Sequence, residues 1–184
     1  MQHNRELVII LDFGGQYAQL IARRTREQNA YCEIWNSETS AEKIAAAKPK
    51  AIILSGGPNS VYGENAPQAD PGLFRLGVPV LGICYGMQLM AQALGGTVAR
   101  ADGKGEYGRA DLHVAEAEGI FDGLPRSFAV WMSHGDRIES IPAALIPIAH
   151  SDNSPFAAVR STDGRLRGIQ FHPEVAHTPC GVEV

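Results

Sequence analysis

Cysteine is scarce in this sequence, and there is no surplus of positive charge. The 184 residues include three cysteines, Cys32, Cys84 and Cys180, an odd number without the spacing of a zinc site or a disulfide framework. We therefore expect a cytoplasmic protein in a reducing environment, with no bound metal. Lysine and arginine total 16 against 20 acidic residues, a formal net charge of −4. Because nothing here neutralises a phosphate backbone, we expect no nucleic-acid partner.

Long apolar runs, internal repeats and low-complexity segments are also missing. The first apolar stretch, residues 7–11, is far shorter than the roughly 20 residues of a membrane helix and too short for a signal-peptide core. We expect no membrane anchor. Hydrophobic residues make up 45% and charged residues 20% of the chain, which is typical of globular proteins. The length of the chain predicts a single domain that spans residues 1–184.

The first half of the chain predicts alternating strands and helices. Continuous apolar runs are typical of strands covered on both faces, and such strands are expected at 7–11, 51–54 and 78–83, with a further strand at 30–35. Helical spacing predicts a helix between the first two strands, and Thr39 with Glu42 predicts a capping box that opens a short helix before the third. Residues 55–72 are expected to form an ordered surface loop, and residues 85–94 a further helix. This alternation indicates an α/β fold with a doubly wound, mostly parallel sheet flanked by helices.

After Thr97 the pattern changes to short alternating runs. These predict antiparallel strands at 112–115, 128–131, 156–159 and 166–171, with Asp163-Gly164 as a hairpin turn. The sheet is therefore expected to be mixed, with a small antiparallel extension.

Cys84 stands where a nucleophile is expected. The segment Gly82-Ile83-Cys84-Tyr85-Gly86 lies between an apolar strand and a helix, like the nucleophile elbow G-x-S-x-G with sulfur in place of the hydroxyl. The helix N-terminus favours thiolate, and neighbouring amides can hold an oxyanion. The alternative is a small buried core cysteine.

A proton carrier is available in Phe171-His172-Pro173-Glu174, at the end of the last apolar strand. His172 and Glu174 are two positions apart, so in an extended segment their side chains lie on one side and can meet. Strand ends converge in such sheets, which predicts that His172 serves Cys84 as acid and base while Glu174 orients it. Taken alone, a histidine beside a proline is more often structural.

A glycine-rich loop, Ser55-Gly56-Gly57-Pro58, follows another buried strand. Its small residues allow backbone N–H groups to approach a substrate oxygen, as an oxyanion hole requires. An ordinary turn is the alternative. The loop lacks the Gly-Lys-Ser/Thr ending of a phosphate-binding loop.

Five motifs resemble one known family, over nearly the whole chain. They are LDFGGQY at 11–17, LSGGP at 54–58, GICYGMQ at 82–88, VWMSHGD at 130–136 and GIQFHPEV at 168–175. The chain resembles the class I, triad-type glutamine amidotransferases, which have a flavodoxin-like fold. The first and fourth motifs, with His177-Thr178, resemble the GMP synthetase branch of that family.

The resemblance implies a γ-glutamyl thioester mechanism with Cys84, His172 and Glu174 as the triad and L-glutamine as substrate. The backbone amides of Gly57 and Tyr85 would form the oxyanion hole. The expected substrate contacts are Gly56, Gln88, Ser133 and His134, the last two through their backbone. Asp136 is a candidate for the interface with a synthetase.

The resemblance also implies a partner, an ATP pyrophosphatase domain or subunit that uses the ammonia to aminate XMP to GMP. The chain continues for ten residues after Glu174, so we expect the family's closing helix and its ATP pyrophosphatase and dimerisation domains to lie outside residues 1–184. No cofactor is expected here, since ATP and Mg²⁺ belong to the synthetase.

Two other functions are compatible with parts of the pattern. A cysteine-elbow hydrolase or chaperone of the PfpI type shares the sheet and the elbow but takes its histidine from the position after the cysteine, where this chain has Tyr85. A regulatory module with a relic site is the non-enzymatic alternative.

Other conspicuous side chains have structural interpretations. Trp35 and Trp131 are expected to pack in the protein, and His113 and His150 to lie without partners. The arginines at 23, 24 and 26 are expected to form a solvated helix face.

Overall fold

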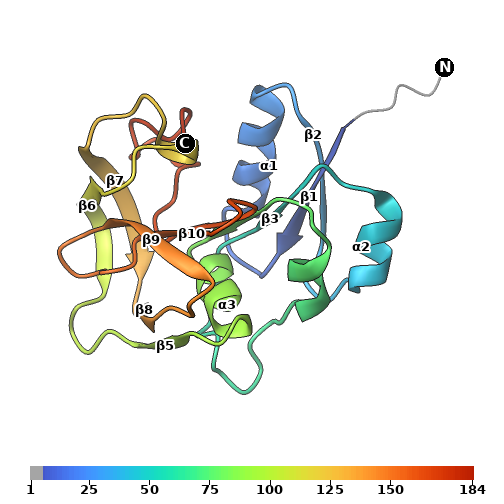
Figure 1. Ribbon diagram of the computed structural model, residues 1–184, viewed down its shortest axis with the longest axis horizontal. Coiled ribbons are helices and arrows are strands. Elements are labelled where there is room, and N and C mark those ends of the chain that lie inside the picture. Colours follow the sequence, from blue (N-terminus) through green and yellow to red (C-terminus); the bar gives the residue numbers. More distant parts are fainter. Residues whose placement is uncertain (1–5) are drawn as a thin grey trace.

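The structure is a computed structural model, of which residues 6–184 are described. Residues 1–5 of the expected domain lie outside the described residues. The described chain contains a nine-stranded sheet in the order β2-β1-β3-β4-β11-β10-β9-β6-β7 and a separate pair, β5-β8 (Figure 1). It is a mixed sheet flanked by helices, which confirms the predicted fold class.

The parallel half of the sheet comes from the first half of the chain and one late strand. Its strands are β1 (Leu7–Asp12), β2 (Tyr31–Asn36), β3 (Ala51–Leu54), β4 (Val80–Ile83) and β11 (Leu166–Ile169). The helices between them are α1 (Ala18–Glu27), α2 (Ala41–Ala47), the 3₁₀ turn η1 (Pro71–Arg75) and α3 (Tyr85–Ala93). β11 pairs in parallel with β4, Ile169 opposite Ile83. The end of the last strand therefore lies beside the end of the strand that precedes Cys84.

The antiparallel half contains β6 (Glu106–Val114), β7 (Ser127–His134), β9 (Leu145–His150) and β10 (Ala158–Ser161). The 3₁₀ turn η2 (Gly119–Phe121) joins β6 to β7, and β5 (Thr97–Arg100) pairs with β8 (Asp136–Ser140). The Asp163-Gly164 hairpin is confirmed between β10 and β11, with Gly164 at φ +70°. Sequence patterning missed β5, β8 and β9, because their residues are partly exposed and lack a regular alternation.

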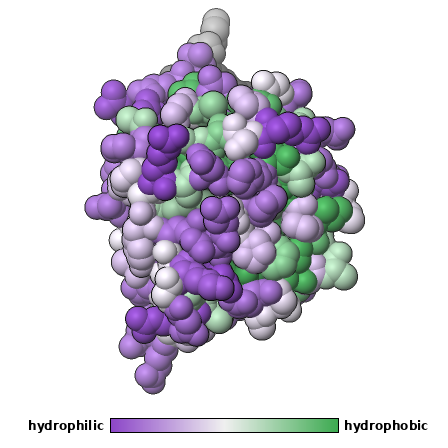
Figure 2. Space-filling model, turned by 90° about the vertical axis from the view of Figure 1, so that its left-hand side faces the viewer, coloured by the Kyte–Doolittle hydropathy of each residue, from purple (hydrophilic) through white to green (hydrophobic). Residues whose placement is uncertain are grey.

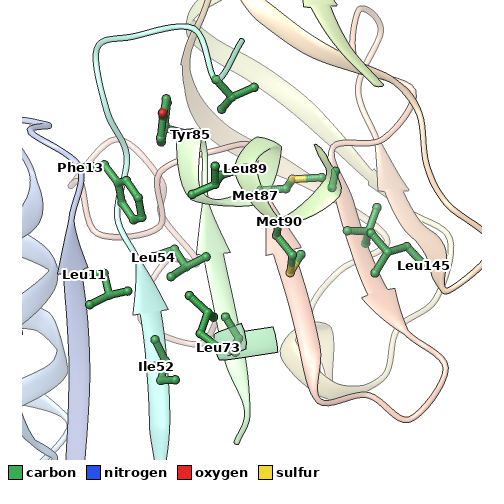
Figure 3. Close-up of a cluster of buried hydrophobic side chains, with 14 of the residues drawn as sticks. Leu11, Phe13, Ile52, Leu54, Leu73, Tyr85, Met87, Leu89, Met90 and Leu145 are labelled. Carbon is green, nitrogen blue, oxygen red and sulfur yellow. The ribbon is translucent and has the colours of Figure 1, made fainter. Parts of the chain in front are cut away.

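Two apolar clusters fill the two faces of the sheet. Ile9 and Leu11 of β1 pack in one cluster with residues of α2 and α3, whereas Ile10 packs in the other with Ile21 of α1. The alternation follows from the two-residue period of a strand. Figure 3 shows the first cluster, where Met87 and Met90 of α3 lie against the strands. This packing fixes α3, and with it the turn that carries Cys84.

The cap of α2 differs from the prediction. Ser40, not Thr39, is the N-cap, and its Oγ accepts a hydrogen bond from Lys43 N at 3.3 Å. Thr39 Oγ1 instead donates to Asn36 O at 2.7 Å. The predicted capping box was therefore wrong: the N-cap lies one residue later, and the residue three positions after it is Lys43 rather than a glutamate or glutamine.

Figure 2 shows the side of the molecule that lies at the left of Figure 1, where β6 and β7 run. Hydrophilic residues dominate this side, with hydrophobic ones among them. Over residues 6–184, no helix is both long and apolar enough to cross a membrane.

Candidate active site

Cys84 forms a strained turn between β4 and α3. Its backbone has φ +53° and ψ −107°, a conformation that is costly for a residue with a side chain and that persists only when the surroundings impose it. A Cβ added to Gly82 would lie 2.7 Å from the backbone of Gly86, and a Cβ added to Gly86 would lie 2.4 Å from Leu54 O. Glycine is thus required on both sides, as the elbow motif predicted.

The sulfur of Cys84 is enclosed but not sealed. The residue is 5% exposed and lines a cavity of about 790 Å³. Gln170 Nε2 donates to Sγ at 3.5 Å, and Ser133 O lies 3.7 Å from Sγ as its acceptor. Sequence reasoning did not assign Gln170. Its position two residues before His172 was the available signal, since alternate residues of an extended segment share a side.

His172 and Glu174 meet as their spacing predicted. His172 Nδ1 lies 2.7 Å from Glu174 Oε1, and the two side chains are 5% and 2% exposed. Within the part of the chain that the structure describes, Glu174 Oε2 has no hydrogen-bond partner. The carboxylate is thus committed to the imidazole.

Four other contacts hold this pair in place. His172 N donates to Trp131 O at 2.9 Å, and Thr178 Oγ1 donates to His172 O at 2.7 Å while accepting from Trp131 N at 3.0 Å. Arg24 Nε donates to Glu174 O at 3.0 Å. The expectation that the α1 arginines form only a solvated face was wrong for Arg24, because the sequence gives no sign that residues 24 and 174 meet.

The electrostatics of His172 favour its charged form. Burial by itself would lower its pKa, but the interactions with Cys84 and with Glu174 raise the pKa of His172 to about 10. A ring that holds a proton beside the sulfur can stabilise a thiolate and then donate that proton to a leaving amine.

The cavity brings the remaining predicted residues together. Besides Cys84 and His172, the cavity is lined by the residues predicted for the oxyanion hole, the substrate contacts and the interface: Gly56, Gly57, Tyr85, Gln88, Ser133, His134 and Asp136. A Cβ on Gly56 would lie 3.1 Å from His172 Cε1, and one on Gly57 would lie 2.9 Å from Phe13 O. The glycine loop therefore lies directly against the catalytic candidates. The predicted oxyanion role of Gly57 and Tyr85 stays a prediction.

The side chain of Tyr85 has a structural role. It is 1% exposed, and its hydroxyl donates to Pro67 O at 2.6 Å. Burial raises the pKa of Tyr85 to about 12. As the first residue of α3, Tyr85 has a backbone N–H without an acceptor inside the helix. Only this backbone group is a candidate for substrate contact.

Gln88, His134 and Asp136 are linked to one another. Gln88 Nε2 donates to Asp136 O at 2.9 Å and to Gln170 Oε1 at 3.1 Å. His134 Nδ1 lies 2.8 Å from the same Asp136 O. The Asp136 carboxylate accepts a hydrogen bond from the Tyr62 hydroxyl at 3.0 Å, which ties the segment that follows the glycine-rich loop to β8. Whether Asp136 also meets a synthetase stays a prediction.

Some side chains outside the site have partners that were not expected. His113 and His150 face each other across β6 and β9 with ring centroids 5.2 Å apart, so the expectation that they lack partners was wrong. Trp131 packs on His177 at 4.4 Å, as a packing residue should.

Residues 6–184 contain no group of three or more histidine, cysteine or acidic side chains arranged to hold a metal ion. That no cofactor is needed here stays a prediction.

The fold and the cavity define a class of α/β protein in which a cysteine at a strand-to-helix elbow faces a histidine held by a carboxylate. A sequence profile described as "Glutamine amidotransferase class-I" matches residues 9–184. The chain belongs to this family, which confirms the resemblance.

Curated relatives point to one branch. The chain is 52% identical over 178 residues to GMP synthase [glutamine-hydrolyzing] of Thermosynechococcus vestitus and 51% identical over 181 residues to that of Trichormus variabilis. These matches cover 97% and 98% of this chain but 33% of each relative. The chain thus spans about a third of the length of the curated relatives it matches.

Solved structures agree on the fold. A putative GMP synthase subunit from Thermoplasma acidophilum superposes with a TM-score of 0.85 at 28% identity, covering 99% of this chain and 91% of that one. A glutamine amidotransferase from Thermotoga maritima, 22% identical with a TM-score of 0.74 and covering 94% of this chain and 78% of that one, shares the fold.

The PfpI-type alternative is not supported, because the histidine near Cys84 comes from the segment after β11 rather than from position 85.

Proposed function

We propose that this chain hydrolyses L-glutamine to glutamate and ammonia. The proposal rests on the arrangement of three residues. Cys84 is held at φ +53° at the N-terminus of α3, and it lies beside His172, whose Nδ1 is 2.7 Å from Glu174 Oε1. A nucleophile, a proton carrier and its orienting carboxylate are thus assembled at one cavity.

The reaction follows from these positions. The thiolate of Cys84 attacks the carboxamide carbon, and the carbonyl oxygen becomes an oxyanion that the N–H groups of Gly57 and Tyr85 stabilise. The C–N bond breaks as His172 gives its proton to the nitrogen. Ammonia departs, and the glutamyl group remains bound to Cys84 as a thioester. His172 then takes a proton from water as the water oxygen attacks the thioester carbon. The C–S bond breaks, which regenerates the thiolate of Cys84 and releases glutamate.

The relatives support a partner for this chain. We propose that the ammonia passes to an ATP pyrophosphatase domain or subunit that aminates XMP to GMP, since the matched relatives are GMP synthases about three times as long. ATP and Mg²⁺ would be bound there, and Asp136 would contribute to the contact. The free thiols Cys32, Cys84 and Cys180 suit the reducing cytoplasm.

The test is glutamate release from glutamine by wild type and by Cys84→Ala, with and without a GMP synthetase ATP pyrophosphatase subunit, XMP and ATP. We expect the substitution to abolish release and the partner with its substrates to raise it. Cys180→Ala is the matched control and should retain release. No release by wild type under any condition would support the relic module.

A further inference from the structure

Behind the cavity lies a buried polar cluster that the proposed reaction does not use. Glu106, the first residue of β6, accepts hydrogen bonds from Ser154 Oγ at 2.6 Å and from Ser151 Oγ at 2.8 Å. Its Oε2 also lies 3.2 Å from His134 Nε2. The side chains of His134 and Glu106 are 2% and 7% exposed. A carboxylate buried to this extent needs several donors to remain charged.

The hydrogen bonds in the cluster keep Glu106 ionised. Burial strongly opposes its charge, but the hydrogen bonds from His134, Ser154 and Ser151 outweigh burial and lower its pKa. The cluster thus provides a fixed negative charge to which His134 is attached.

From His134 the contacts lead to the cavity. Both ring nitrogens of His134 face oxygen acceptors, Glu106 Oε2 and Asp136 O. The Asp136 carbonyl accepts a second hydrogen bond, from Gln88 Nε2 at 2.9 Å. His134 therefore fixes a carbonyl that orients a side chain lining the cavity.

The orientation of Gln88 has a chemical consequence. Its amide nitrogen is used by Asp136 O and Gln170 Oε1, both acceptors. This leaves the oxygen of Gln88 as the group that can accept from a bound amino acid or amide. The turn 133–136 also carries Ser133 O, which lies against the sulfur of Cys84.

We infer that Glu106 is a positioning residue for the glutamine site, acting through His134 on the turn 133–136 and on Gln88. The inference rests on the proposed function. Glu106 contacts none of the groups proposed to react. Its loss should weaken the binding of the amino acid more than the chemistry at the sulfur.

The first experiment measures steady-state glutamate release by Glu106→Gln, which keeps the volume and removes the charge. We expect KM for glutamine to rise about tenfold, since an interaction with a charged group is lost, while kcat stays within about threefold. The matched control is Glu116→Gln. This variant removes a carboxylate that is ion-paired with Arg160 at 2.6 Å but does not line the cavity, and both of its constants should stay at the wild-type value.

A second readout separates positioning from general damage. The rate of Cys84 alkylation would be measured with two reagents. Iodoacetamide reacts without recognition of an amino acid, whereas a chloroketone analogue of glutamine must first bind in the glutamine site. In Glu106→Gln the chloroketone reaction should slow about tenfold, in line with the loss of a charged hydrogen bond, and the iodoacetamide reaction should not. Equal slowing of both reactions, or an unchanged KM, would overturn the inference.

A third arm tests the route through His134. If Glu106 acts through that ring, Glu106→Gln combined with His134→Asn should raise KM no further than His134→Asn alone. Additive effects would refute the route. If Glu106→Gln does not fold, Ser154→Ala removes one donor to Glu106 and should raise KM about threefold. Wild type without glutaminase activity would refute the proposed function, whereas active wild type with an unaffected Glu106→Gln would refute the inference alone.

Discussion

Replacing Glu174 with glutamine is the sharpest test of how the site works. The substitution keeps the size of the side chain and an oxygen that can accept from His172 Nδ1, at present 2.7 Å from Oε1. What disappears is the negative charge, in surroundings where the carboxylate is only 2% exposed. Solvent screens little of this interaction.

The magnitude follows from the loss of a charged hydrogen bond. Such bonds contribute about 1.5–3 kcal/mol, and each 1.4 kcal/mol is about tenfold in an equilibrium constant. If the charge stabilises the protonated ring to this extent, glutamate release should fall roughly 10- to 100-fold in kcat. The pKa of His172, now about 10, should fall toward its ordinary value of 6.5.

The sign of the pH effect is set by the direction of this shift. The folded-state pKa of His172 lies above the ordinary value of 6.5. Its protonated ring therefore contributes in full to the stability of the folded protein below pH 6.5, and this contribution is lost as the pH rises through about 10. In Glu174→Gln this loss should occur at lower pH.

Two measurements check the prediction. Steady-state glutamate release gives the change in kcat, and NMR titration of the His172 ring gives its pKa in wild type and variant. Glu116→Gln again serves as the control. Wild-type release by Glu174→Gln, or an unchanged pKa of His172, would show that the carboxylate only fills space.

Two further substitutions test the scaffold of the site. Gly86→Ala places a Cβ 2.4 Å from Leu54 O, so we expect a loss of at least about 3 kcal/mol in unfolding free energy by urea denaturation; a loss under about 1 kcal/mol would contradict the packing. Thr178→Val removes the hydroxyl that links His172 O to Trp131 N, and should cost about 1–3 kcal/mol in the same assay. Thr178→Ser, which keeps the hydroxyl, should recover most of that loss, and an equal loss in both variants would refute the role of the hydroxyl.

The sequence alone determined the local parts of the site. The glycines around Cys84 leave one turn available between a buried strand and a helix, and the alternation of an extended segment places His172 beside Glu174. The hydrophobic pattern was likewise sufficient to predict β1, β3, β4 and α3, because the apolar residues of each element form a continuous pattern that is buried in the apolar clusters.

Only the tertiary structure decided how these parts meet. The insertion of β11 between β4 and β10 brings His172 to Cys84 across 88 positions, and no local pattern encodes a strand order. Arg24 on Glu174 O and Glu106 behind His134 depend on the same long-range pairings. Their residue types are common on solvated surfaces, so what identifies them is the partners they meet and, for Glu106, its burial, which exist only in the folded chain.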